Sequence, residues 1–317
     1  MIGRLILALA LAPAGAFAFK LSLPVDCVLD QTCYIQQYPD HDPGRDAQDF
    51  TCGGLSYDGH DGTDFALPTR AAMNNGVAVL AAAPGVVKGR RDGVEDFLAP
   101  VAGRDCGNGV VIDHETGWQT QYCHLRKGSV LVAPGQQVAR GQILGMIGQS
   151  GAAEFPHLHL LVRQNTEEVD PFAPDRSIIC DTTAQDRWAK DLLTNDIVYQ
   201  PGGILQAGFA EAIPGFNAVK AGISVTELPP SAPALVAWAY LYGTQSGDAV
   251  VFKVVGPKGE ILTERSKLDR TQALSFRAVG RKLTADEWPE GEYHAEIRLM
   301  RGQLRVDEVR ALVRVSP

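Results

Sequence analysis

Two short patterns in the sequence place histidine and aspartate side chains at spacings that suit a metal site. In the first, residues 59–65 read Gly-His-Asp-Gly-Thr-Asp-Phe, so that His60 and Asp64 stand four residues apart with a glycine between them. Both side chains can turn toward one point from a bent loop or a strand end, and imidazole and carboxylate are good zinc ligands. Taken alone, a polar surface loop is the commoner explanation for such a pattern.

The second pattern is a His-Leu-His run at residues 156–162 within an apolar stretch. Side chains alternate between the two faces of a strand, so His157 and His159 are expected to face the same way, with the neighbouring leucines facing the core. A third histidine, His124, ends the run Gln-Tyr-Cys-His-Leu at residues 121–125. On its own, His124 reads as a solvent-facing strand residue.

Taken together and in this order, the three patterns resemble the lysostaphin-type (LytM-like) zinc peptidases, which cleave peptides of bacterial peptidoglycan. That family has a His-x-x-x-Asp motif, then Tyr-x-His-Leu, then His-x-His, and all three are present here. The glycine-punctuated runs at residues 81–87, 109–114 and 138–145 also resemble family strands. The resemblance covers about residues 57–175.

The resemblance implies that His60, Asp64 and His159 hold a catalytic Zn2+ and that His124 and His157 are catalytic histidines. Three protein ligands leave a fourth position for water, as a catalytic zinc requires. No His-Glu-x-x-His motif is present, so an imidazole would take the proton that a glutamate takes elsewhere. One histidine would orient or deprotonate the metal-activated water, and the other would stabilise the developing oxyanion.

The first eighteen residues are typical of a secretory signal. Arg4 precedes an apolar run from Leu5 to Leu11, and small residues at Ala16 and Ala18 predict cleavage after Ala18. A membrane anchor is disfavoured because the run is short and is followed by Pro13. We therefore expect an exported protein, periplasmic or extracellular, with no membrane span in the mature chain.

The six cysteines all lie in the first 180 residues. An even number in an exported protein indicates three disulfides, whereas zinc ligation by thiolates is disfavoured because no Cys-x-x-Cys pair occurs. Cys106 and Cys123 lie near the open end of a hairpin predicted at residues 110–125 and are the best candidate pair; the other pairings stay open. A free thiol at Cys123 would compete for zinc, and a disulfide there would stiffen the site.

Short apolar runs separated by glycine and proline predict an all-β, mostly antiparallel fold. Trp188, Leu192 and Leu193 share one face at helical spacing, which predicts a single helix near them. We expect five parts: a signal peptide at 1–18, a Cys-containing segment of loops and turns at 19–58, a zinc metallopeptidase domain of the barrel-sandwich hybrid type at 59–175, a helical linker at 176–200 and a C-terminal β-sandwich of unknown role at 201–317.

The net charge of −8 disfavours a nucleic-acid partner, because phosphate binding needs a basic face. The expected function is hydrolysis of peptidoglycan peptide bonds by a secreted zinc endopeptidase. The alternative is an inactive relative that activates another cell-wall hydrolase. A carrier or phosphotransfer domain is a third possibility, since residues 132–138 resemble such domains, but no lysine stands at a modifiable hairpin tip.

Several features near the site carry weaker expectations. The C-terminal part could bind the cell wall, pack over the cleft or join an envelope protein. The connection from Arg90 to Cys106 is long, and loops beside a site often decide substrate choice. Of the remaining histidines, His41 is expected to be solvated, His114 to be structural, and His294 to have no evident partner.

Overall fold

The computed structural model describes residues 19–175, 180, 186–190, 197–223 and 225–317. The predicted signal peptide, and Leu192 and Leu193 of the predicted helical linker, lie outside the described residues. Among the described linker residues, Trp188 forms a parallel β-bridge with Leu21. Within the described part of the chain, no helix is long and apolar enough to cross a membrane.

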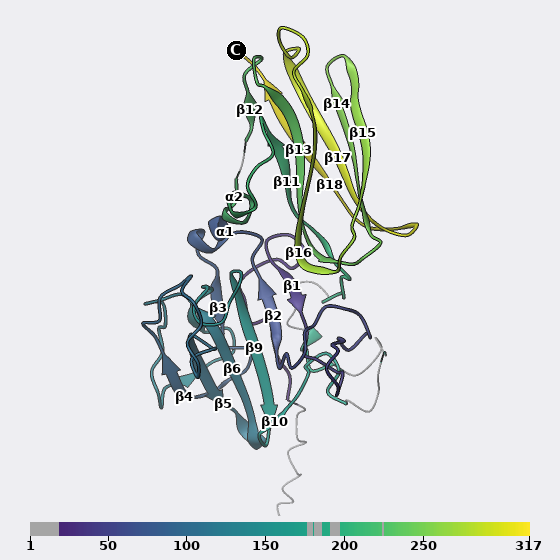
Figure 1. Cartoon of the computed structure of the whole chain (residues 1–317). Coiled ribbons are helices and arrows are strands. Elements are labelled where there is room, and N and C mark those ends of the chain that lie inside the picture. The colour runs from purple at the N-terminus through teal and green to yellow at the C-terminus, as the bar shows by residue number, and fades with distance from the viewer. Residues whose placement is uncertain (1–18, 176–179, 181–185, 191–196, 224) are drawn as a thin grey trace, which may run out of the picture.

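The N-terminal part of the chain is built on one antiparallel sheet, which lies in the lower half of Figure 1. A short further strand, β10 (Glu167–Glu168), pairs with the end of β9 (His157–Gln164) in this sheet. A small separate sheet pairs β3 (Ala78–Leu80) with β8 (Ile143–Met146). In spatial order the main strands are β1 (Tyr34–Gln37), β2 (Thr63–Ala66), β9 (His157–Gln164), β6 (Trp118–Leu125), β5 (Asn108–Asp113), β4 (Gly85–Arg91) and β7 (Gln137–Val138).

The alternation expected for the His-Leu-His strand is present. Leu158 and Leu160 of β9 are fully buried and belong to the main apolar core, together with Tyr122 of β6. The histidines of β9 project from the other face of the strand, toward β2 and the end of β6. The core therefore fixes the position of β9, and β9 presents both histidines on one side.

The segment at 19–58 contains a strand that the sequence did not predict. β1 pairs with β2, and its four residues are all buried. Leu21 and Val25 of the same segment lie in the main core. Because β1 is covered on both faces, its sequence Tyr-Ile-Gln-Gln lacks the apolar–polar alternation by which a half-exposed strand is recognised.

The hairpin predicted at residues 110–125 is confirmed, with β5 and β6 joined by a short 3₁₀ turn, η1 (Glu115–Gly117). The disulfide between Cys106 and Cys123 is also confirmed, so no free thiol competes for a metal there. The other two pairs, which the sequence left open, are Cys27–Cys33 and Cys52–Cys180.

The C-terminal part is a sandwich of two sheets around its own core, which includes Leu241, Phe252 and Ile297. One sheet contains β11 (Gly203–Ala210), β13 (Ala234–Thr244) and β16 (Gln272–Lys282). The other contains β12 (Glu227–Leu228), β18 (Leu304–Val315), β17 (Gly291–Arg301), β14 (Ala249–Gly256) and β15 (Gly259–Lys267). The expected all-β architecture, with mainly antiparallel sheets, is confirmed.

The sandwich stands on the β1 end of the N-terminal sheet (Figure 1). The rings of Tyr34 in β1 and Tyr242 in β13 are 4.5 Å apart between centroids. Two short helices that the sequence did not predict, α1 (Arg70–Asn75) and α2 (Phe216–Ala221), also meet there. Gly222, which ends α2, lies so close to Thr69 that a Cβ would be 3.0 Å from the threonine hydroxyl oxygen. The two parts of the chain are therefore in direct contact beside the strands that carry the histidines.

Candidate active site

The three side chains expected to hold a metal converge on one point. Asp64 of β2 and His159 of β9 are directly paired across the two strands, and His60 lies in the loop that leads into β2. The Nδ1 atom of His159 is 3.0 Å from Oδ1 of Asp64 and 3.3 Å from Nε2 of His60. The Asp64 Oδ1 and His60 Nε2 atoms are also 3.3 Å apart. All three residues are buried.

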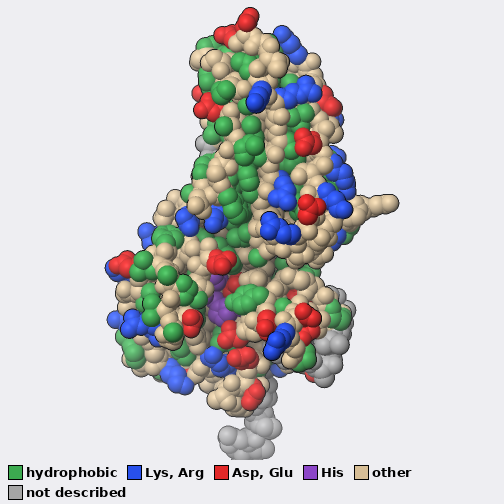
Figure 2. Space-filling model, in the orientation of Figure 1, with side chains coloured by type: hydrophobic (Ala, Val, Ile, Leu, Met, Phe, Trp, Pro, Cys, Tyr) green, Lys and Arg blue, Asp and Glu red, His purple; other side chains and the backbone are tan. Residues whose placement is uncertain are grey.

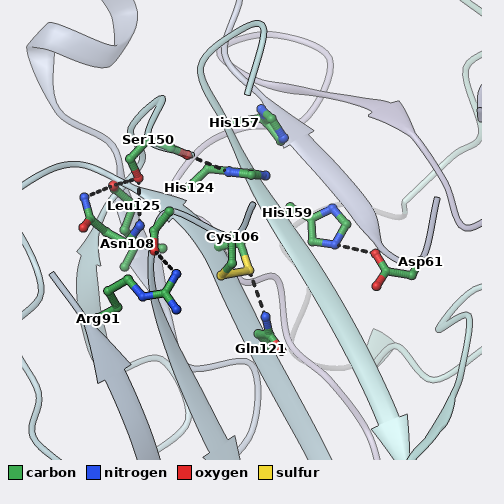
Figure 3. The surroundings of a disulfide bond; sticks show 12 residues. Asp61, Arg91, Cys106, Asn108, Gln121, His124, Leu125, Ser150, His157 and His159 are labelled. Carbon is green, nitrogen blue, oxygen red and sulfur yellow. Dashed lines mark hydrogen bonds and ion pairs between the residues drawn. A yellow bond between two sulfur atoms is a disulfide. The ribbon is translucent and has the colours of Figure 1, made fainter. Parts of the chain in front are cut away.

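Hydrogen bonds on the far side of each imidazole leave the converging nitrogen free. His60 donates from Nδ1 to the carbonyl oxygen of Tyr38 at 2.8 Å, so its Nε2 keeps a lone pair. His159 contacts Oδ1 of Asp61 through Nε2 at 3.1 Å, which leaves Nδ1 available (Figure 3). A metal-binding histidine commonly has such an outer partner, which fixes its tautomer and the orientation of its ring.

The donor set fits a zinc ion. Ligands about 2.0–2.1 Å from a tetrahedral zinc lie roughly 3.3 Å from one another. The three atoms, which are separated by 3.0–3.3 Å, match that spacing, and two imidazoles with one carboxylate are borderline ligands of the kind zinc prefers. His60, Asp64 and His159 are also the residues whose side-chain atoms form a possible metal-binding group among the described residues.

The electrostatics of the group also suit a cation. Burial alone would raise the pKa of Asp64, but the neighbouring His157 and His60 and a hydrogen bond to His159 hold it well below its usual value. Burial would lower the pKa of His159, but Asp61 and Asp64 outweigh it and raise that pKa to about 9. A carboxylate and an electron-rich imidazole thus attract positive charge at this point, and a metal would displace the proton of His159.

His124 and His157 lie beside this group. Their ring centroids are 4.6 Å apart, and the Nε2 atom of His157 is 3.5 Å from Oδ1 of Asp64. His124 donates from Nδ1 to the carbonyl oxygen of Ser150, and His157 donates from Nδ1 to that of Phe155, both at 2.8 Å. Each ring, when neutral, therefore has its proton on Nδ1 and a lone pair on Nε2. Figure 2 shows histidine side chains in a hollow below the sandwich.

Both rings are held in the neutral form. Burial is the main cause that places the pKa of His124 well below its ordinary value. Burial also lowers the pKa of His157, although Asp64 partly opposes it. A neutral imidazole with a free Nε2 can accept a proton.

Phe155 connects His157 with the sandwich. Its ring stacks on the ring of His157 with centroids 4.4 Å apart, and its carbonyl oxygen accepts the hydrogen bond from the same histidine. Phe155 also packs against the small apolar cluster of Tyr34, Ala66 and Tyr242, the last from β13. The C-terminal part of the chain thus supports the residue that orients His157.

The remaining histidines have structural contacts. The expectation that His41 is solvated is wrong: its side chain is buried and its Nε2 lies 2.8 Å from Asp170, a carboxylate far away in the sequence. His114 is structural as expected, with its two nitrogens bonded to Pro84 and Thr120. His294 lies 4.0 Å from Glu292 on the sandwich, so it has an acidic neighbour.

The sequence did not single out the residues that orient the five side chains. Asp61, Ser150 and Phe155 belong to this group, and so does the Tyr38 carbonyl. Only Asp61 had a local signal, because it lies within the first pattern next to His60. The contacts of Ser150 and Tyr38 depend on how separate segments meet, and Phe155, two residues before His157, acts through a backbone carbonyl that no side-chain type marks.

Asp61 offers a direct test of the outer contact to His159. We expect Asp61→Asn to lower zinc affinity about 10- to 100-fold, because it removes the negative charge that orients His159 and makes its ring more basic. Zinc affinity is measured by competition with a chromophoric chelator. Asp58→Asn, which changes an exposed acid of the same loop, serves as the control and should keep the original affinity. Equal affinities for the two variants would rule out this role for Asp61.

Comparison with known proteins agrees with the site. Residues 58–171 match the model of Peptidase family M23. The chain is 42% identical over 106 residues to the peptidoglycan DD-endopeptidase ShyA of Vibrio cholerae, a match that covers 33% of this chain and 20% of that protein. It is 34% identical over 114 residues to the DD-carboxypeptidase/endopeptidase Mpg of Neisseria meningitidis, over 35% of this chain and 22% of that protein. The matches thus span about a fifth of the length of these relatives.

Among solved structures, the chain is similar to a zinc-containing peptidase from Vibrio cholerae, with 29% identity and a TM-score of 0.34 over 49% of this chain and 39% of that one. The segment that matches the family model, residues 58–171, contains all five histidine and aspartate residues described above. Residues 58–171 therefore form a domain of Peptidase family M23, the lysostaphin-type family. The family match does not extend to the C-terminal sandwich.

Proposed function

We propose that this protein is an exported zinc endopeptidase that hydrolyses peptide bonds of bacterial peptidoglycan. The observation that carries the proposal is the convergence of His60, Asp64 and His159 on one point, with the free nitrogens of two neutral histidines beside it. The relatives named as peptidoglycan endopeptidases support the substrate class. The disulfides support export, because such bonds persist in oxidising compartments.

In this proposal His60, Asp64 and His159 hold the metal. When bound, zinc polarises the scissile carbonyl and makes a water molecule more acidic. His124, neutral and with its Nε2 free, accepts the proton of the attacking water and returns it to the leaving amine. His157 directs its Nε2 toward the same centre, and with a proton on that nitrogen it stabilises the negative charge that develops on the carbonyl oxygen; Asp64, 3.5 Å away, favours this protonated form.

The alternative, an inactive relative that activates another hydrolase, is less well supported. Loss of a ligand would be the mark of such a protein, and here the three donor atoms are present and correctly spaced. A protein partner for the sandwich remains a proposal compatible with either function. Tyr242 of the sandwich belongs to the apolar cluster against which Phe155 packs, and this supports a role for the sandwich beside the site.

The proposal is tested with the purified mature protein and isolated peptidoglycan. We expect soluble muropeptides whose masses identify one cleaved peptide bond, one zinc ion per chain, loss of activity on chelation and recovery when zinc is restored. A protein that binds zinc but releases no fragments would support the activator alternative. A protein that neither binds zinc nor releases fragments would overturn the zinc-peptidase assignment.

The contact between Phe155 and the sandwich leads to a further prediction. We expect Phe155→Ala to lower the rate about tenfold, roughly 1.4 kcal/mol, with zinc content unchanged, because His157 loses the ring against which it is stacked. Phe155→Leu, which retains apolar bulk in the cluster, should fall between this variant and the original protein. The rates are measured on a soluble cross-linked muropeptide. An unchanged rate in Phe155→Ala would show that this contact does not orient His157.

A further inference from the structure

The segment around Cys106 is hydrogen-bonded to the backbone of His124 and is joined by a disulfide to the residue before it. The backbone N–H of His124 donates to the carbonyl oxygen of Cys106 at 2.8 Å. The disulfide joins Cys106 to Cys123, the residue immediately before His124 (Figure 3). The backbone of His124 has a φ of +64°, a conformation that few residues other than glycine adopt. A histidine held in this conformation needs its neighbours to maintain it.

The same segment also fixes the acceptor of the His124 ring. Ser150, whose carbonyl oxygen accepts from Nδ1 of His124, accepts through its hydroxyl from the N–H of Asn108 at 2.9 Å. The N–H of Ala152 donates to the carbonyl oxygen of Asp105 at 2.8 Å. Gly107 packs against Ser150 so closely that a Cβ would lie 2.4 Å from the serine carbonyl. Residues 105–108, which we call the wedge, thus lie between the backbone of His124 and Ser150, whose carbonyl oxygen is hydrogen-bonded to the His124 ring.

The disulfide fastens this wedge to the sheet. Cys123 is paired with His159 across β6 and β9, so the Cys123 end of the bond is anchored beside the metal-binding group. Gln121, on the same side of β6, donates to the sulfur of Cys123 at 3.2 Å. The other end carries the long connection from Arg90, whose Asp96 and Phe97 pair with residues 149–150. Without the bond, the wedge would be held to β6 by hydrogen bonds and packing alone.

We propose that the Cys106–Cys123 disulfide, acting through the wedge of residues 105–108, positions His124 for proton transfer. This inference rests on the proposed function, because it assigns the disulfide to the orientation of the base in that reaction. The bond lies outside the metal-binding group and touches neither substrate nor metal in this assignment. Its loss should therefore change the catalytic step and leave the metal in place.

The first test replaces both cysteines, since a single replacement would leave a free thiol next to His124. We expect Cys106→Ser with Cys123→Ser to lower kcat about 10- to 100-fold, as a small misplacement of a catalytic group does, with KM and zinc content unchanged. Cys27→Ser with Cys33→Ser removes a disulfide elsewhere and should keep the original kcat. If the two double variants have the same kcat, or if zinc is lost together with activity, the positioning role is wrong.

A second test leaves every cysteine intact, which covers the case in which the double variant does not fold. In Gly107→Ala the added methyl group would collide with the backbone of Ser150 and displace it. In Gly103→Ala, which lies in the connection between Arg90 and Cys106, the added methyl group would have no other atom within 4 Å. Both glycines have positive φ values, 61° and 74°, so backbone strain is matched. We expect kcat to fall more than about tenfold for Gly107→Ala relative to Gly103→Ala. Equal kcat values would overturn the proposal, whereas inactivity of the original protein would refute the proposed function.

Discussion

His159→Ala is expected to abolish both zinc binding and peptidoglycan hydrolysis. The substitution removes the imidazole whose Nδ1 lies 3.0 Å from Oδ1 of Asp64, and it leaves Asp61 without its imidazole partner. Two remaining donors are too few for a catalytic zinc site, which needs three protein ligands. The zinc content should fall from about one ion per chain to near zero, and the rate should fall to that of the blank.

The measurement for His159→Ala is zinc by elemental analysis after dialysis, together with muropeptide release. His294→Ala, in which an exposed histidine of the sandwich is replaced, is the matched control and should retain both zinc and activity. Thermal melting of the two variants separates loss of the metal from loss of the fold. A His159→Ala protein that still carried one zinc per chain would show that the ligand set is different.

His124→Ala is expected to keep the zinc and lose most of the rate. General acid–base catalysis by a positioned side chain contributes about 10²- to 10⁴-fold, so kcat should fall by that factor, or about 3–5 kcal/mol of transition-state stabilisation. The zinc should stay because His124 contributes no atom to the group of three donors. This variant thus separates proton transfer from metal binding, which His159→Ala cannot do.

The positive φ of His124 shapes the choice of replacement. Alanine is strained in that conformation, whereas asparagine adopts it more readily, so His124→Asn is made alongside His124→Ala. Both should be equally slow if the loss is that of the base, because neither side chain can take up a proton at neutral pH. A fully active His124→Asn variant would remove His124 from the mechanism, and an active variant with an altered KM would point to substrate binding instead.

The metal-binding group could be predicted from sequence because its members stand in short motifs. His60 and Asp64 are four residues apart, and His159 stands on a strand whose alternation is visible in the sequence. The residues that orient them could not be predicted. Ser150 and Phe155 act through backbone carbonyls, which every residue has, so no side-chain type marks the function.

The errors in the fold have a related cause. β1 was overlooked because both of its faces are covered, which removes the alternation that marks a strand. β15 has a weak sequence signal for the opposite reason, since most of its residues are exposed and its apolar pair, Ile261 and Leu262, is adjacent rather than alternating. His41 was assigned to solvent because its partner, Asp170, lies 129 residues away. Only the folded chain brings such pairs together.

The disulfide between Cys52 and Cys180 has a mechanical consequence. It joins two points 128 residues apart that lie just outside the matched peptidase segment at 58–171, so the covalent path from one flank to the other bypasses that segment. A pull between the start of the chain and the sandwich would pass through the sulfur bridge and not along the backbone of residues 58–171. A single backbone cut inside the bridged loop would likewise leave both pieces covalently joined.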